Sequence, residues 1–319
     1  MNSVAKAVGS PDYYAAAFEH SITWEDDVWQ ADPVDVEEVH SKARQKFYDV
    51  LGKVTGSSNG NGAGQARILL FHGQSGAGKT HLVRALRTKS HRDGQAYFGY
   101  AQMTPDVANY ADYFLRRLIN SLEKPYHPDE NGESGLARLT RRMVEAGLGD
   151  GEIEKLRDGD LGEEELAELV LALADDILIS EAFAEQELDV NIIRALLYLQ
   201  RADPRIDQRV RQYLFGRELN ELSHRSVRAL DPNSGDGRAF EIIEALGKII
   251  WTIEKAALVF CIDQVEDLRN FDDPEERFTK AVGNLMQIAN RVPSSIIIIS
   301  VLEEFYGQAR AVLHQSYID

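Results

Sequence analysis

Four short runs of apolar residues stand out along the chain and predict the strands of a buried sheet. They cover 67–72, 96–101, 256–263 and 294–300. The segments between them carry apolar residues three or four positions apart. This spacing predicts helices over about 79–90, 105–123, 238–255 and 274–288. Strands that alternate with helices in this way predict an α/β fold, in which helices cover both faces of a parallel sheet and give three layers.

The first part of the chain, residues 1–64, differs from this alternating pattern. Residues 1–30 are rich in aromatic and acidic side chains without clear periodicity, and we expect Trp24 and Trp29 to anchor this arm on the core. Asp32-Pro33 predicts a helix start, and apolar spacing continues the helix over 34–54. Residues 55–64 are mostly Gly, Ser and Asn, the composition of a flexible linker. We therefore expect an N-terminal helical arm over 1–64 and a core over 65–319.

Residues of about 124–240 show helical spacing and no convincing strand pattern, which predicts a large helical insertion in the core. The stretch 151–189 is very acidic and carries a leucine-rich face. Such a run could form a metal or partner surface, although a solvated helix face is its ordinary interpretation. Arg201, Arg205 and Arg209 follow at helical spacing. They could pair with the acidic helices, contact nucleic acid or reach a neighbour's nucleotide.

Residues 73–80 read Gly-Gln-Ser-Gly-Ala-Gly-Lys-Thr, the pattern GxxxxGK[ST] between a predicted strand and a predicted helix. Glycines in such a turn let backbone N–H groups point at phosphate oxygens, and the helix adds the positive end of its dipole. Lys79 would reach the β- and γ-phosphates, and the Thr80 hydroxyl would ligate Mg²⁺. We assign nucleotide binding to this loop and the next residue: Gly73, Gln74, Ser75, Gly76, Ala77, Gly78, Lys79, Thr80 and His81.

The third apolar run ends in Asp263, which is a second candidate ligand for Mg²⁺. Ligands bind at the carboxyl ends of parallel strands, and an acid there can hold the metal directly or through water. Gln264 follows at the position where many ATPases carry a glutamate that polarises the attacking water. An amide orients water but cannot accept its proton, whereas Glu266 could do so if the loop turns back. Slow hydrolysis, Glu266 as base and a pure binding switch all remain open.

The fourth apolar run ends in Ser300, a hydroxyl on the strand predicted beside the one that carries Asp263. A polar side chain there can hydrogen-bond the γ-phosphate or the attacking water. Ser300 is therefore a candidate sensor of the γ-phosphate, although an ordinary strand terminus has the same appearance.

Taken together, the segments 73–80, 258–263 and 296–300 resemble an additional-strand P-loop ATPase of the AAA+ type. Their layout is similar to the origin-recognition-like and STAND-like branches, and the motifs Gly-Lys-Thr-His-Leu and Asp-Gln-Val-Glu-Asp-Leu loosely resemble large bacterial anti-phage (BREX-like) ATPases. The resemblance implies ATP and Mg²⁺ as ligands. It also implies a fifth strand, an arginine finger and a helical lid after Ser300. We expect these parts to be missing here and supplied by a longer protein or another chain.

Composition and charge limit the partners and the cellular location that we expect for this predicted ATPase. The formal net charge of −17 argues against a generally basic nucleic-acid-binding surface, although a local patch would survive it. A single cysteine, Cys261, excludes an intramolecular disulfide framework and a thiolate zinc cluster. We see no signal peptide and no apolar run of membrane-spanning length, and we therefore expect a cytoplasmic protein.

Two functions from different classes fit these features. The first is an ATP-binding, ATP-hydrolysing, Mg²⁺-dependent domain that drives a conformational change in a larger bacterial machine. The second is a nucleotide-dependent interaction module with little or no hydrolysis, which Gln264 favours. Both imply protein partners or self-association. A small-molecule kinase is a third possibility, but the acidic insertion does not resemble its arginine-bearing lid.

Overall fold

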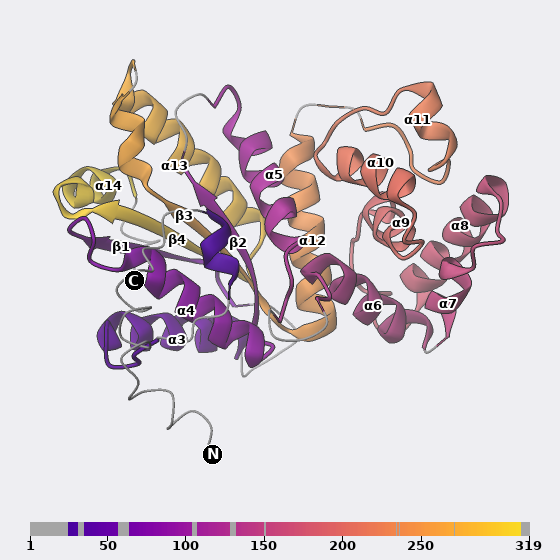
Figure 1. Cartoon of the computed structure of the whole chain (residues 1–319), viewed down its shortest axis with the longest axis horizontal. Coiled ribbons are helices and arrows are strands. Elements are labelled where there is room, and N and C mark those ends of the chain that lie inside the picture. The colour runs from indigo at the N-terminus through magenta and orange to yellow at the C-terminus, as the bar shows by residue number, and fades with distance from the viewer. Residues whose placement is uncertain are drawn as a thin grey trace, which may run out of the picture.

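The structure is a computed structural model that describes residues 25–30, 35–56, 64–103, 107–127, 132–149, 151–233, 235, 237–270 and 272–313. In this part of the chain a parallel four-stranded sheet lies at the centre of the α/β core (Figure 1). Its strands are β1 (Arg67–Gly73), β2 (Ala96–Gln102), β3 (Ala257–Asp263) and β4 (Ser295–Leu302). The predicted fold class is confirmed.

The strand order β1-β4-β3-β2 places the first two strands of the chain at opposite edges of the described sheet. β1 connects to β2 through α4 (Lys79–Arg92), but β4 and β3 lie between them. The burial of the two central strands, β4 and β3, explains this order. Every residue of β3 is buried and nearly every residue of β4 is, so both strands need cover from neighbours on both sides.

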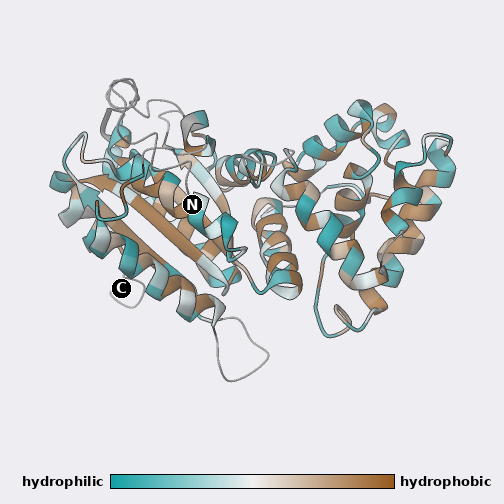
Figure 2. Cartoon of the chain, turned by 60° about the horizontal axis from the view of Figure 1, so that its bottom comes forward, coloured by the Kyte–Doolittle hydropathy of each residue, from teal (hydrophilic) through white to brown (hydrophobic). Residues whose placement is uncertain are grey.

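One face of the sheet is covered by α3 (Ser41–Thr55), α4 and the short η1 (Glu25–Trp29). Phe47, Leu86 and Phe98 pack here with side chains of β3 and β4. The strands of the sheet are mostly brown in the hydropathy view (Figure 2). Trp29 is buried, as expected, and the guanidinium of Arg87 lies 5.4 Å from its ring centroid. Trp24 and most of the predicted linker lie outside the described residues.

The helix predicted over 34–54 begins later than expected. Residues 37–40 form a turn, and His40 adopts a left-handed conformation with φ 58° immediately before α3. This conformation breaks the helical pattern, so Val36 and Val39 remain exposed although their spacing is helical. The predicted start at Asp32-Pro33 lies outside the described residues, and within them the helix begins at Ser41.

The other face of the sheet is covered by α5 (Tyr110–Leu122), α12 (Arg238–Glu254) and α13 (Pro274–Arg291). Beside the β1 edge, η3 (Glu303–Phe305) leads into α14 (Tyr306–Val312), and the rings of Tyr306 and His72 lie 4.4 Å apart. Among the described residues, no helix is long and apolar enough to cross a membrane.

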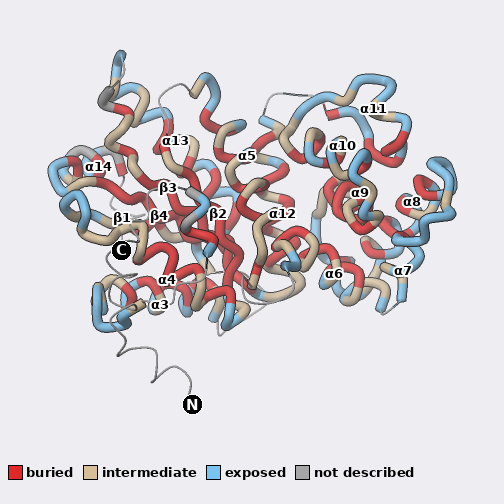
Figure 3. The backbone as a smooth tube through the Cα atoms, in the orientation of Figure 1, coloured by how far each residue is buried: buried red, intermediate tan, exposed pale blue. Residues whose placement is uncertain are grey.

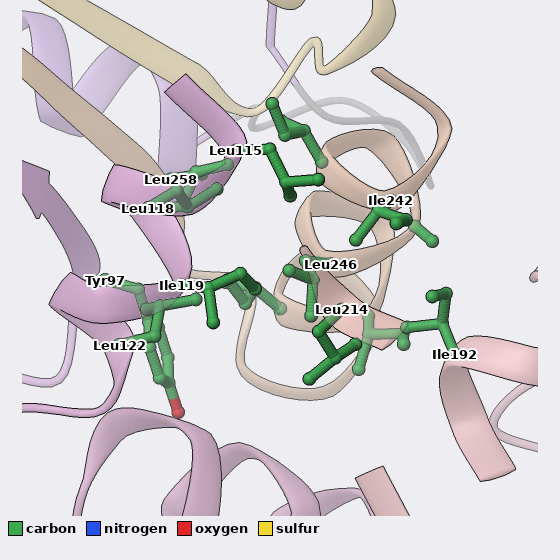
Figure 4. Packing of buried hydrophobic residues seen from close by; sticks show 14 of the residues in the cluster. Tyr97, Leu115, Leu118, Ile119, Leu122, Ile192, Leu214, Ile242, Leu246 and Leu258 are labelled. Atoms are coloured by element: carbon green, nitrogen blue, oxygen red, sulfur yellow. The ribbon is translucent and has the colours of Figure 1, made fainter. Parts of the chain in front are cut away.

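The region predicted as an insertion forms helices beyond α5 and α12 (Figure 1). Apolar side chains connect it to the core: Ile192 and Leu214 from this region lie near Ile119 and Leu246 of α5 and α12 (Figure 4). The sequence boundaries predicted for the insertion, about 124 and 240, remain untested. Its helices are α6 (Gly135–Leu148), α7 (Glu152–Arg157), α8 (Glu163–Ile179), α9 (Val190–Leu199), α10 (Pro204–Leu214) and α11 (Glu221–Arg225).

A buried ionic contact adds to this connection. The carboxylate of Glu254, at the end of α12, is almost fully buried and accepts hydrogen bonds from Tyr97 of β2 and Arg138 of α6, both at 3.1 Å. A buried carboxylate is costly without such partners. The contact therefore holds α6 against the amino end of β2.

The acidic stretch of the insertion behaves as a solvated face. On α8, Leu166, Val170 and Leu173 are buried while the intervening acids are exposed (Figure 3). Within the described residues, no group of three or more His, Cys, Asp or Glu side chains could hold a metal ion. Of the arginines that follow, Arg228 lies 2.6 Å from Glu164, and Arg201 donates to backbone carbonyls before α8.

Candidate functional site

The predicted P-loop is a tight turn between the end of β1 at Gly73 and the start of α4 at Lys79. Gly76 and Gly78 have φ values of 73° and 81°, in the left-handed region that glycine adopts without strain. A residue with a side chain would be strained at either position, so glycine favours this conformation of the loop. The first backbone N–H groups of an α-helix have no hydrogen-bond partner within the helix. In α4 these groups lie at the P-loop, where they can bind a phosphate.

Lys79 lies across its own loop. Its ammonium group donates hydrogen bonds to the carbonyl oxygens of Gly73 at 3.1 Å and Gln74 at 3.2 Å. These are the residues at the opposite end of the turn, so the cation spans the concave side of the loop. The position is the one from which an ammonium can reach a phosphate chain held by the loop amides.

Thr80 and Asp263 meet although they are distant in sequence. The Thr80 hydroxyl donates to Oδ2 of Asp263 at 2.7 Å, and the backbone N–H of Gln264 donates to the other carboxylate oxygen, Oδ1, at 3.0 Å. Asp263 as a whole residue is 2% exposed. Hydroxyl and carboxylate oxygens are the ligands that Mg²⁺ prefers, so the pair fits this metal.

Tyr100 joins the same carboxylate and was not predicted. Its hydroxyl donates to Oδ2 of Asp263 at 3.0 Å. Burial, followed by the negative charge of Asp263, raises the pKa of Tyr100, so the hydroxyl keeps its proton and remains a donor. One signal was available in the sequence, because a tyrosine inside a buried strand usually needs a partner for its hydroxyl.

Glu266 lies on a turn that brings it back towards the loop. Gln264 has φ 57°, and η2 (Val265–Asn270) follows directly. One carboxylate oxygen of Glu266 accepts a hydrogen bond from the backbone N–H of Leu302 at 3.3 Å. Burial raises the pKa of Glu266, against the opposing effects of its backbone hydrogen bonds and the charge of Lys79. A raised pKa suits a carboxylate that must accept a proton.

Ser300 lies inside β4 and does not end it. The strand continues to Leu302, so the expectation of a strand terminus at Ser300 is wrong. Ser300 pairs in register with Phe71 of β1, its side chain is buried, and its hydroxyl has no hydrogen-bond partner in the part of the chain that the structure describes. Because side chains alternate along a strand, Ser300 faces the same side as Ile296 and Ile298, which is the side of α4.

A segment before α3 packs against the end of the P-loop, which sequence reasoning missed. A methyl group placed on Gly78 would come within 3.2 Å of Nε2 of His40. His81 lies 3.5 Å from a carboxylate oxygen of Asp35, and Arg44 holds both oxygens of the same carboxylate. Although partial burial opposes it, Arg44 lowers the pKa of Asp35. His81 therefore faces this segment, and the predicted N-terminal arm is part of the site's surroundings.

Residues 62–180 match a family model described as AAA domain. The chain carries an AAA-like P-loop domain. The match to this domain includes the loop, Lys79, Thr80 and Tyr100, and it ends before the strands that carry Asp263 and Ser300. No curated protein and no solved structure matches the chain. The narrower resemblances to the origin-recognition-like, STAND-like and BREX-like groups stay predictions.

Proposed function

We propose that this AAA-like P-loop domain binds ATP with Mg²⁺ and hydrolyses it by in-line attack of water on the γ-phosphate. The observation that carries the proposal is the 2.7 Å hydrogen bond between Thr80 and Asp263. It brings the two predicted metal ligands to one point beside the phosphate-binding loop. Mg²⁺ at this point would neutralise charge on the phosphates.

Each residue then has a chemical role. Lys79 and the amides of the loop bind the phosphates and stabilise their charge, which is where most of the catalysis of phosphoryl transfer arises. Glu266 accepts the proton of the attacking water, and Gln264 helps to orient that water. Ser300 donates its free hydroxyl to the γ-phosphate or the water. In this proposal hydrolysis drives a conformational change in a larger bacterial machine, with cytoplasmic location and an anti-phage role as further expectations.

A second candidate is a nucleotide-dependent interaction module in which hydrolysis is incidental. Two observations favour it: Gln264 replaces a carboxylate directly after Asp263, and Glu266 is held by the backbone N–H of Leu302. The contact of His40 and Asp35 with the loop end supplies a route by which bound nucleotide would affect the N-terminal segment. Protein partners or a second copy of the chain would then recognise the nucleotide-bound form.

Steady-state phosphate release separates the two candidates. We would compare the wild type with Lys79→Ala and Glu266→Gln, and use Lys53→Ala as the control because Lys53 is an exposed lysine of α3. Hydrolysis predicts that wild type and Lys53→Ala release phosphate while the two site variants fall by about 100-fold or more. Calorimetry with ATP and Mg²⁺ completes the test. Binding without phosphate release above Lys79→Ala would favour the interaction module, and no binding would exclude both.

A further inference from the structure

The contact between Tyr100 and Asp263 follows from the pairing of β2 with β3. Tyr100 pairs in register with Cys261, and Asp263 is two residues further along the neighbouring strand. A diagonal neighbour of this kind is within reach of a long aromatic side chain. Both side chains point to the α4 side of the sheet, where Thr80 lies in the first turn of that helix.

The backbone and the ring of Tyr100 are both held in place by their surroundings. β2 is the edge strand of the described sheet, so the outward backbone groups of Tyr100 have no partner among its strands. The hydroxyl of Ser121, on α5, accepts from the Tyr100 N–H at 3.0 Å and lies 3.3 Å from its carbonyl oxygen. The ring is fully buried between the strands and α4. The tyrosine hydroxyl therefore has a fixed position relative to the carboxylate.

We propose that Tyr100 is a positioning residue for the metal site: its hydroxyl orients the Asp263 carboxylate so that the carboxylate and Thr80 together bind Mg²⁺ with the nucleotide. The proposal rests on the proposed nucleotide and Mg²⁺ binding. Oδ2 of Asp263 accepts from both Thr80 and Tyr100. Without the tyrosine hydroxyl, the carboxylate loses one of the hydrogen bonds that orient it, and the bonds from Thr80 and Gln264 hold it less firmly. Mutation of a residue that hydrogen-bonds a metal ligand typically weakens metal affinity by about 10- to 100-fold.

The test compares two tyrosines of the same strand. Tyr100→Phe removes the hydroxyl that bonds Asp263. Tyr97→Phe is the matched control, since Tyr97 is also buried and its hydroxyl also bonds a buried carboxylate, Glu254, but on the opposite face of the sheet. The readout is the binding of a fluorescent ATP analogue, measured in EDTA and then across a Mg²⁺ titration. Thermal melting shows whether each variant is folded.

We expect Tyr100→Phe to raise the Mg²⁺ concentration for half-maximal enhancement of binding by at least 10-fold, with little change in affinity in EDTA. Tyr97→Phe should leave both quantities as in the wild type. An unchanged Mg²⁺ midpoint in Tyr100→Phe would overturn the proposal, as would an equal shift in both variants. A wild type that binds no nucleotide would instead overturn the proposed function.

A second measurement covers the case in which Tyr100→Phe does not fold. 3-Fluorotyrosine in place of Tyr100 keeps the hydroxyl and nearly the same volume. Its ¹⁹F resonance should move when Mg²⁺ is added to the ATP-bound protein, and the same label at Tyr97 should not respond. A resonance at position 100 that ignores Mg²⁺ would contradict the proposed positioning role.

Discussion

The hydroxyl of Thr80 donates a hydrogen bond to the carboxylate of Asp263, which lies 183 positions further along the sequence. The two residues belong to the first turn of α4 and the last position of β3. The bond connects the helix that follows the phosphate-binding loop to the end of a central strand of the sheet. It also means that Thr80 has a function in the fold that can be tested separately from any role at the metal.

Thr80→Val keeps the shape of the side chain and removes its hydroxyl. We expect it to reduce phosphate release by about 100-fold, the usual effect of losing one donor or ligand at such a site. Thr80→Ser retains the hydroxyl and should keep most of the activity. Phosphate release at saturating ATP, repeated at several Mg²⁺ concentrations, measures the effect. Equal activity of the valine and serine variants would contradict the assignment of Thr80.

Glu266→Gln should separate activity from stability. The pKa of Glu266 is raised in the folded chain, so the folded state holds the proton more tightly than the unfolded state. Stability from this group therefore falls as the pH rises from the unfolded to the folded pKa. A glutamine avoids that loss and can still accept from Leu302. We expect a higher Tm than the wild type at neutral pH, a difference that disappears at acid pH where both states are protonated, and a loss of phosphate release.

The control for Glu266→Gln is Glu304→Gln, which removes an exposed carboxylate close to Leu302. It should change neither the Tm nor phosphate release. The wild-type rate of phosphate release should also rise with pH through the raised pKa of Glu266, because only the ionised carboxylate accepts a proton. A rate that ignores pH in this range would exclude Glu266 as the base.

Gly78→Ala places a side chain where the backbone has φ 81° and where His40 lies 3.2 Å from the new methyl group. The left-handed conformation alone costs about 1–2 kcal/mol for a residue with a side chain. We expect a lower free energy of unfolding in urea and a loss of ATP binding. The matched control is Gly283→Ala, in the middle of α13, where nothing lies within 4 Å. It should stabilise the protein by about 0.5–1 kcal/mol.

Gly247→Ala tests the packing of α12 on the segment that follows α13. A methyl group on Gly247 would come within 2.4 Å of a methyl carbon of Val292. Overpacking of this kind typically costs about 1–3 kcal/mol. Val292→Ala removes the obstructing carbon, so the double variant should be more stable than the sum of the two single changes predicts. Urea unfolding of the four proteins measures the coupling, and strict additivity would show that the two positions do not contact each other.

The sequence alone predicted much of the local structure. Strand runs such as 256–263 and 294–300 were placed within one or two residues, because continuous apolar residues are required wherever a strand is buried on both faces. The start of α3 was not predicted, because His40 takes a left-handed conformation that periodicity does not report. The contact between Asp35 and His81 was also missed, because a contact between residues so far apart in the sequence depends on how separate elements pack.

What the sequence by itself determined is a parallel α/β fold and a phosphate-binding loop, since these depend on consecutive residues whose polarity and backbone freedom can be read directly. The tertiary structure decided which strands are neighbours, and with that which side chains surround the carboxylate of Asp263. Strand order depends on the burial of whole faces, and a hydrogen bond such as that of Tyr100 to Asp263 depends on register and side-chain reach. Neither is a property of a local stretch of chain.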